Sequence, residues 1–160
     1  MSEEIRISEH PATIVVDVAN VMGSRPDGWW RDRAGAAVRL HDQLAALAAS
    51  GRAILPGQTG QPDFVMVLEG AARAAASRIR AAEVARGPQG AAAGPDRPAQ
   101  PGRVRVVEAR GSGDDAIVAL VRELPGRRVV VTADRELRDR CTAAGAAVLG
   151  PAWLLGLLRQ

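Results

Sequence analysis

Carboxylates follow four β-branched runs of this sequence, at the points where the runs end. In chain order, the polar residues at these points are Asp17 with Asn20, Glu69, Asp114 with Asp115, and Thr132 with Asp134. Two carboxylates ~4 Å apart repel by ~4 kcal/mol at an effective dielectric constant of ~20, so a cluster of them needs a cation. Oxygen ligands without His or Cys select Mg²⁺ or Mn²⁺ over zinc. The sequence therefore predicts one or two Mg²⁺ or Mn²⁺ ions.

Such an ion suits phosphodiester hydrolysis, because it lowers the pKa of a bound water and a second ion can steady the leaving oxygen. The predicted metal ligands are Asp17, Asp114, Asp115, Asp134 and Glu69. In the helix expected after "GSG", Asp114 aligns with the apolar positions and Asp115 with the solvent side. We therefore favour Asp114 as the inward ligand and Asp115 as its partner. Thr132 and Asp134 are two residues apart on one strand and share a side.

A purely structural role is the alternative for each of these acids. Asp114, Asp115 or Asp134 could cap a helix N-terminus and oppose its dipole. Glu69 could begin an ordinary helix in "LEGAARAAA". Asp17 is harder to explain in this way, because we predict no helix directly after it and an unpaired carboxylate at the end of a buried strand is costly.

The elements that must position these residues alternate along the chain. Patterns typical of strands occur at 13–18, 63–68, 103–109, 127–133 and 146–150, and those at 13–18 and 63–68 are typical of buried strands. Helical patterns occur at 32–50, 71–86, 114–124, 135–144 and from Pro151 onward. This alternation predicts an α/β fold with a mostly parallel sheet of about five strands. Ligands of such sheets lie beyond the carboxyl ends of the strands, where the acids are expected.

The length and composition fit one domain over residues 1–160. Residues 87–102, rich in Gly, Pro and Ala, are expected to form a flexible surface insertion. With one cysteine, Cys141, the chain has no disulfide framework. No apolar run is long enough to span a membrane and the N-terminus lacks a signal-peptide pattern, so we expect a cytoplasmic protein with no membrane partner.

All 21 basic residues are arginine. The absence of lysine excludes a P-loop, which needs Lys before Ser or Thr, and it excludes Schiff-base chemistry. No G-x-G-x-x-G follows the first strand, which argues against a dinucleotide-binding domain.

Three motifs resemble those of NYN domains, a family of PIN-like ribonucleases. "IVVDVANVM" is similar to their first motif, "GSGDDAIVALV" to their third, and "VVVTADRELRDRC" with "GAAVLGPAWLL" to their fourth motif and C-terminal end. The resemblance implies a three-layer α/β/α, Rossmann-like fold and metal-dependent cleavage of RNA. It also implies that Asn20 positions a ligand or the scissile phosphate and that Thr132 supports the site.

The segment after the first motif, "SRPDGWWRDR", contains two of the three tryptophans of the chain. Stacking of bases on tryptophan beside arginines that bind phosphate is a common way to hold single-stranded nucleic acid. The predicted substrate-binding residues are Arg25, Trp29, Trp30, Arg31 and Arg33. The alternative is that both rings pack over the first long helix, or that one ring has each role. Trp153 is expected to pack in the core or to face a partner, Cys141 to be a small buried side chain, and His10 and His41 to have surface or helix-face roles.

Two functions from different classes follow. The first is a Mg²⁺- or Mn²⁺-dependent endoribonuclease, and the second is an RNA-binding or protein-interaction module on the same fold with weak or no catalysis. The sequence leaves open whether the protein is a monomer or a homodimer.

Overall fold

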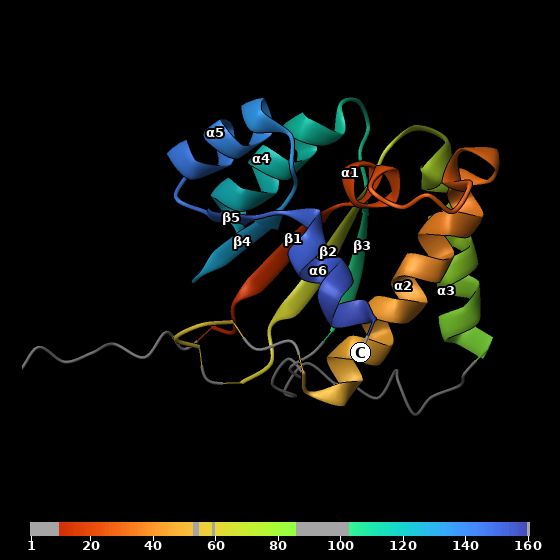
Figure 1. Ribbon diagram of the computed structural model, residues 1–160, viewed down its shortest axis with the longest axis horizontal. Helices are drawn as coiled ribbons and strands as arrows, with labels where there is room; N and C mark the ends of the chain where they lie inside the picture. Colours follow the sequence, from red (N-terminus) through yellow and green to blue (C-terminus); the bar gives the residue numbers. More distant parts are fainter. Residues whose placement is uncertain (1–9, 53–54, 59, 86–102, 160) are drawn as a thin grey trace, which may run out of the picture.

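The computed structural model describes residues 10–52, 55–58, 60–85 and 103–159 of the chain. Its strands form one sheet in the order β3-β2-β1-β4-β5, and every neighbouring pair is parallel (Figure 1). The strands are β1 (Thr13–Asp17), β2 (Asp63–Leu68), β3 (Val104–Glu108), β4 (Arg128–Val131) and β5 (Ala147–Leu149). The predicted α/β class and parallel sheet are thus confirmed.

Helices connect the strands, and the pattern of alternation is the predicted one. They are α1 (Val18–Gly23), α2 (Arg33–Ser50), α3 (Ala75–Ala85), α4 (Gly113–Glu123), α5 (Arg135–Ala143) and α6 (Pro151–Leu158), with short 3-10 helices η1 (Trp29–Arg31) and η2 (Gly70–Ala74). Within the described part of the chain, each predicted strand and helix is present with boundaries close to those expected.

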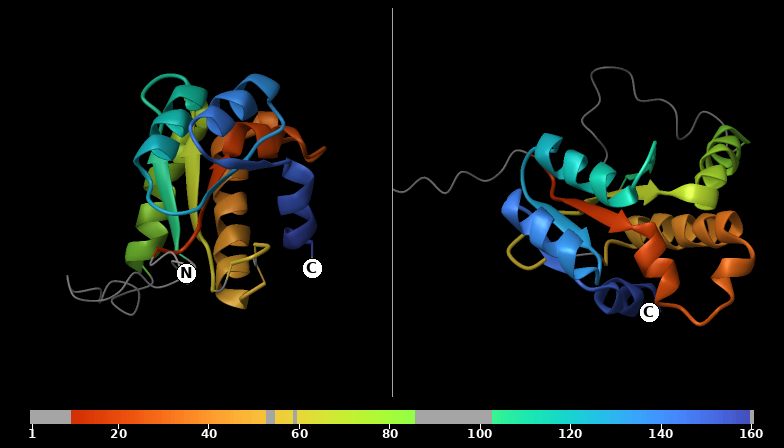
Figure 2. Two further views of the ribbon diagram at one scale, coloured as in Figure 1. Left: turned by 90° about the vertical axis from the view of Figure 1, so that its left-hand side faces the viewer. Right: turned by 90° about the horizontal axis from the view of Figure 1, so that it is seen from above.

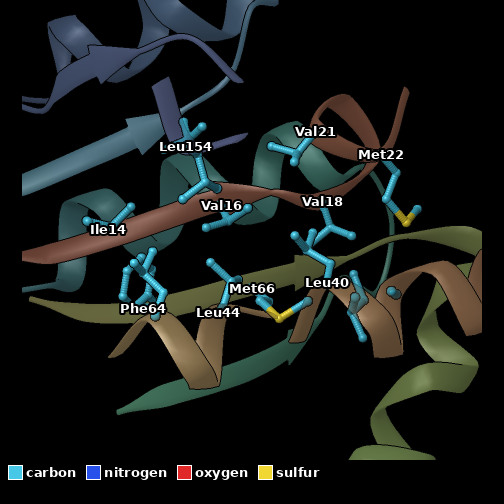
Figure 3. Close-up of a cluster of buried hydrophobic side chains, with 14 of the residues drawn as sticks. Ile14, Val16, Val18, Val21, Met22, Leu40, Leu44, Phe64, Met66 and Leu154 are labelled. Carbon is cyan, nitrogen blue, oxygen red and sulfur yellow. The ribbon is translucent and has the colours of Figure 1, made fainter. Parts of the chain in front are cut away.

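The sheet is covered on both faces, which explains why its central strands are apolar between their ends. Ile14 and Val16 of β1 belong to a core shared with α1, α2 and α6, whereas Val15 between them belongs to a second core with α4 and α5. Figure 3 shows the first core, with Phe64 and Met66 of β2 in the same layer. Figure 2 shows α2 and α4 on opposite sides of β1. This is a three-layer α/β/α fold.

One local prediction was wrong, because a helix does begin directly after Asp17. The Asp17 carboxylate accepts a hydrogen bond from the Asn20 N–H and so caps α1, in a region predicted to be the strand end and a loop. Val18, Val21 and Met22 have the i, i+3, i+4 spacing of a helix face, and all three are buried in the first core. The β-branched Val18 extends the strand-like run, and this hid the start of the helix.

Residues 87–102, predicted to be a flexible insertion, lie outside the described residues. Among the residues that the structure does describe, no helix is both long enough and apolar enough to cross a bilayer.

Candidate active site

The order of the strands reverses between β1 and β4. The chain builds β1, β2 and β3 outward in one direction, and β4 then pairs with the other side of β1. Such a reversal leaves a crevice beyond the carboxyl ends of the two strands, where open α/β sheets bind their ligands. Asp17 ends β1, and Thr132 and Asp134 directly follow β4, so three of the predicted site residues are at this crevice.

Asp17 is held by two hydrogen bonds from different elements. The Thr132 hydroxyl donates to Asp17 Oδ2 at 2.9 Å, and the Asn20 N–H donates to Oδ1 at 3.3 Å. Thr132 is fully buried and Asp17 is 9% exposed. Burial raises the pKa of Asp17, and so do the charges of Asp114 and Asp134, while the two hydrogen bonds oppose the rise. The two hydrogen bonds therefore fix the orientation of the side chain, while burial and the neighbouring charges disfavour its ionised form.

Asn20, the single asparagine of the chain, makes a second connection between the ends of β1 and β4 from its position on α1. Its Oδ1 accepts a hydrogen bond of 2.8 Å from the Ala133 N–H, in the turn after β4. An aspartate here would place another negative charge beside Asp17, whereas the amide oxygen accepts the same bond without a charge. In this structure Asn20 holds the turn that precedes Asp134.

Asp134 has the capping role that the sequence left open. Its Oδ1 accepts from the Leu137 N–H at 2.8 Å at the start of α5, and its own N–H donates to the Thr132 hydroxyl oxygen at 3.1 Å. The hydroxyl of Thr132 thus lies between the two acids, donating to one and accepting from the backbone of the other. Capping uses one oxygen of Asp134, and the side chain still contributes to the raised pKa values of Asp17 and Asp114.

Asp114 approaches the same crevice from the start of α4, and Glu69 approaches it from the end of β2. Burial raises the pKa of Asp114, and the charges of Asp134 and Glu69 raise it further. Glu69 lies over the start of α4, where a Cβ atom on Gly113 would be 2.6 Å from Glu69 Oε2. The absence of a side chain at Gly113 leaves the space that the glutamate fills. The N-cap of α4 is Ser112, whose hydroxyl accepts from the Asp115 N–H, so neither Asp114 nor Asp115 caps this helix.

Asp115 points away from this group, as its helical position predicted. It is 72% exposed and accepts a hydrogen bond of 2.8 Å from Arg140 of α5. Arg140 also lowers the pKa of Asp114 through its charge. The sequence alone does not distinguish Arg140, because α5 contains several arginines and no spacing separates this one from the rest.

The donor chemistry at the crevice fits a hard divalent cation, since it consists of carboxylate, amide and hydroxyl oxygens. Burial and then the charges of neighbouring acids raise the pKa values of Asp17 and Asp114, while the charge of Arg140 opposes the rise at Asp114. In their present positions, however, no three Asp, Glu, His or Cys side chains of the described segments form a group that could hold one ion. The ligand set Asp17, Asp114, Asp115, Asp134 and Glu69 therefore stays a prediction.

The tryptophan segment lies between α1 and α2, and its two rings differ in their surroundings. Trp29 is partly buried and packs against the first core, whereas Trp30 is 55% exposed. The rings meet edge to face, with centroids 6.2 Å apart. This arrangement matches the expected alternative in which the two rings have different roles, because one packs on the core and the other faces solvent. The Arg25 guanidinium donates a hydrogen bond to the side-chain oxygen of Gln43 on α2, and Arg31 and Arg33 are exposed.

The remaining residues with possible chemistry are distant from the acids in the fold or are buried. Cys141 is buried in the second core, and Trp153 packs against the first, as expected. His41 is buried on α2, with Nδ1 3.6 Å from Asp42 and Nε2 3.9 Å from Glu83 of α3, which matches the helix-face role that was one of the two expected for it. The helical face that it shares with Leu40 and Leu44 accounts for its burial.

Comparisons with known proteins were made for the sequence and for the fold. No family model and no curated protein sequence matches the chain. Among solved structures, the chain is similar to the W164L mutant of Rae1 (YacP) from Bacillus subtilis, at 15% sequence identity and a TM-score of 0.55. The match covers 92% of this chain and 74% of Rae1. At that identity, the likeness shows that this chain has the same fold as Rae1.

Proposed function

We propose that the protein is a metal-dependent ribonuclease that hydrolyses RNA at the carboxyl ends of β1 and β4. The observation that carries the proposal is the convergence of Asp17, Asp114 and Asp134 at the sheet's reversal point, where burial and the charges of neighbouring acids raise the pKa values of Asp17 and Asp114. Acids in such a crevice are candidates for function. The resemblance of three motifs to NYN domains supports RNA as the substrate, as does the Arg- and Trp-containing segment beside the site.

Each residue has a role that its contacts support. Asp17, Asp114 and Asp134 would hold the cation, with Glu69 and Asp115 as additional acids. Thr132 fixes the orientation of Asp17 through its hydroxyl, and Asn20 holds the turn that carries Asp134. A bound divalent cation would neutralise the acids, acidify water for attack on phosphorus, and stabilise charge on the phosphate.

The second candidate is an RNA-binding module on the same fold with weak or no catalysis. Two observations favour it: Arg140 already pairs with Asp115, and no three acids of the described residues form a ready metal site. We rank it below the nuclease, because a group of carboxylates does not itself attract RNA. A binding module alone gives no reason for the acids to gather there.

The test is cleavage of labelled single-stranded and hairpin RNAs with Mn²⁺, with Mg²⁺ and with EDTA. We expect Mn²⁺-dependent cleavage that falls at least about 100-fold in Asp17→Asn and Asp114→Asn, the scale of loss when a catalytic electrostatic group is removed. Glu123→Gln is the control, since it removes one charge from the exposed C-terminal end of the helix that carries Asp114. Cleavage that persists in EDTA or in both aspartate variants would refute the proposal. RNA binding without any cleavage would favour the second candidate.

A further inference from the structure

Trp30 is an exposed aromatic ring in a protein with few aromatic residues. Large apolar side chains are exposed at Trp30 and Val84 among the described residues. Full burial of an aromatic side chain is a strong stabilising contribution, so a half-exposed tryptophan forgoes part of it. The neighbouring Trp29 packs on the core, which shows that the segment can bury a ring. The exposure of Trp30 therefore has no explanation in folding.

The local backbone holds this ring in place. Gly28 has a left-handed conformation, with φ of 76°, and its carbonyl accepts from the Arg31 N–H at 3.0 Å. The Trp29 N–H donates to Asp27 Oδ1, and the following Asp32 caps α2 through Gly35. The two indoles meet at 87°, so the anchored Trp29 supports the edge of the exposed ring. Trp30 is thus presented on a rigid turn.

Guanidinium groups surround the pair of rings. The Arg31 Cζ atom lies 5.9 Å from the centre of the Trp30 ring, and the Arg33 Cζ atom lies 5.4 Å from that of Trp29. Within the described segments, neither arginine nor Arg25 forms an ion pair with a carboxylate. Burial lowers the pKa of Arg25, and the nearby positive charges of Arg159 and Arg39 lower it further, while the negative charge of Asp27 raises it. The segment from Arg25 to Arg33 thus carries three arginines against two aspartates, and both aspartates accept hydrogen bonds from backbone N–H groups.

This segment lies at the same edge of the sheet as the acids. Asp17 caps α1, the short helix α1 leads to Arg25, and the turn with the two tryptophans then starts α2. Figure 1 shows α1 and the start of α2 along the edge to which β1 points. A polyanion held by the arginines could thus extend toward the crevice.

We propose that Trp30, with Arg31 and Arg33, binds an unpaired nucleotide of the RNA, so that the site selects single-stranded segments. The indole offers a face for a base, and the guanidinium groups offer donors for the flanking phosphates. A base within a duplex is stacked on its neighbours and does not present its face. The inference rests on the proposed function and adds to it which form of RNA the site accepts.

The test measures binding in EDTA, so that it does not depend on cleavage. The probes are a short oligouridylate and the same oligouridylate in a blunt duplex with oligoadenylate, each measured by fluorescence anisotropy. We expect the wild type to prefer the single strand. Trp30→Ala should weaken single-strand binding about 5- to 150-fold, the effect of losing one stacked base, and Trp30→Phe should retain most of the affinity. Duplex binding should change less than about twofold in both variants.

Two matched variants control for general effects. Val84→Ala removes the other exposed apolar side chain, and Arg78→Ala removes an exposed arginine from α3, whereas Arg31→Ala removes one beside Trp30. Arg31→Ala should weaken binding and Arg78→Ala should not. The inference fails if the wild type does not bind the single strand, if Trp30→Ala behaves like Val84→Ala, or if it weakens single-strand and duplex binding equally. Binding through Trp30 without cleavage in Mn²⁺ would refute the proposed nuclease and leave the RNA-binding surface.

Discussion

At the scale of single residues, Thr132 connects the acid that ends β1 with the acid that follows β4. Its buried hydroxyl donates to Asp17, and its oxygen accepts from the backbone N–H of Asp134. One side chain thus orients the acids at the ends of two neighbouring strands. The sequence predicted that Thr132 and Asp134 share a side, but it could not predict the bond to Asp17, because the residues are 115 positions apart.

Substitution of Thr132 by valine should therefore be costly although the shape is nearly kept. Thr132→Val removes a donor from a buried carboxylate, and we expect the free energy of unfolding to fall by about 1–3 kcal/mol. Urea denaturation measures this change, and RNA cleavage by the same variant should also fall. Thr132→Ser keeps the hydroxyl and is the control. Equal stability and activity of the valine variant and the wild type would show that the bond has no role.

At the scale of helices and strands, the sequence predicted most of the framework. The run at 63–68 is apolar from Phe64 to Leu68 because the strand is buried on both faces, and the structure has β2 at the same residues. The start of α1 was missed, since Val18 continues the apolar run of β1. The signal that marks it is the aspartate at the N-cap followed by the buried face of Val18, Val21 and Met22.

The ion pair between α4 and α5 separates the roles of the two adjacent acids. Because Asp115 pairs with Arg140 near the surface, we expect Asp115→Asn to reduce RNA cleavage less than Asp114→Asn does. The pair should contribute little to stability, as exposed pairs do. Cleavage rates of the two variants and a double-mutant cycle with Arg140→Gln measure both effects. A loss in Asp115→Asn as large as in Asp114→Asn would instead make Asp115 an essential ligand.

At the scale of the whole molecule, the order of the strands creates the site. Asp17 and Thr132 become neighbours because β4 pairs with β1 instead of extending the sheet beyond β3. The sequence placed the acids at one edge of the sheet, but alternation of strands and helices does not specify which strands are adjacent. The acids gather where the fold reverses, and their charges raise the pKa values of Asp17 and Asp114.

The central claim is that these acids bind a divalent cation, and calorimetric titration of the protein with Mn²⁺ tests it most directly. The wild type and the control Glu123→Gln should bind Mn²⁺ with similar affinity, while Asp114→Asn should lose at least about tenfold in affinity, equal to about 1.4 kcal/mol. Asp17→Asn should lose as much. The account predicts this pattern without RNA present. Mn²⁺ binding that is absent from the wild type, or unchanged in both aspartate variants, would contradict it.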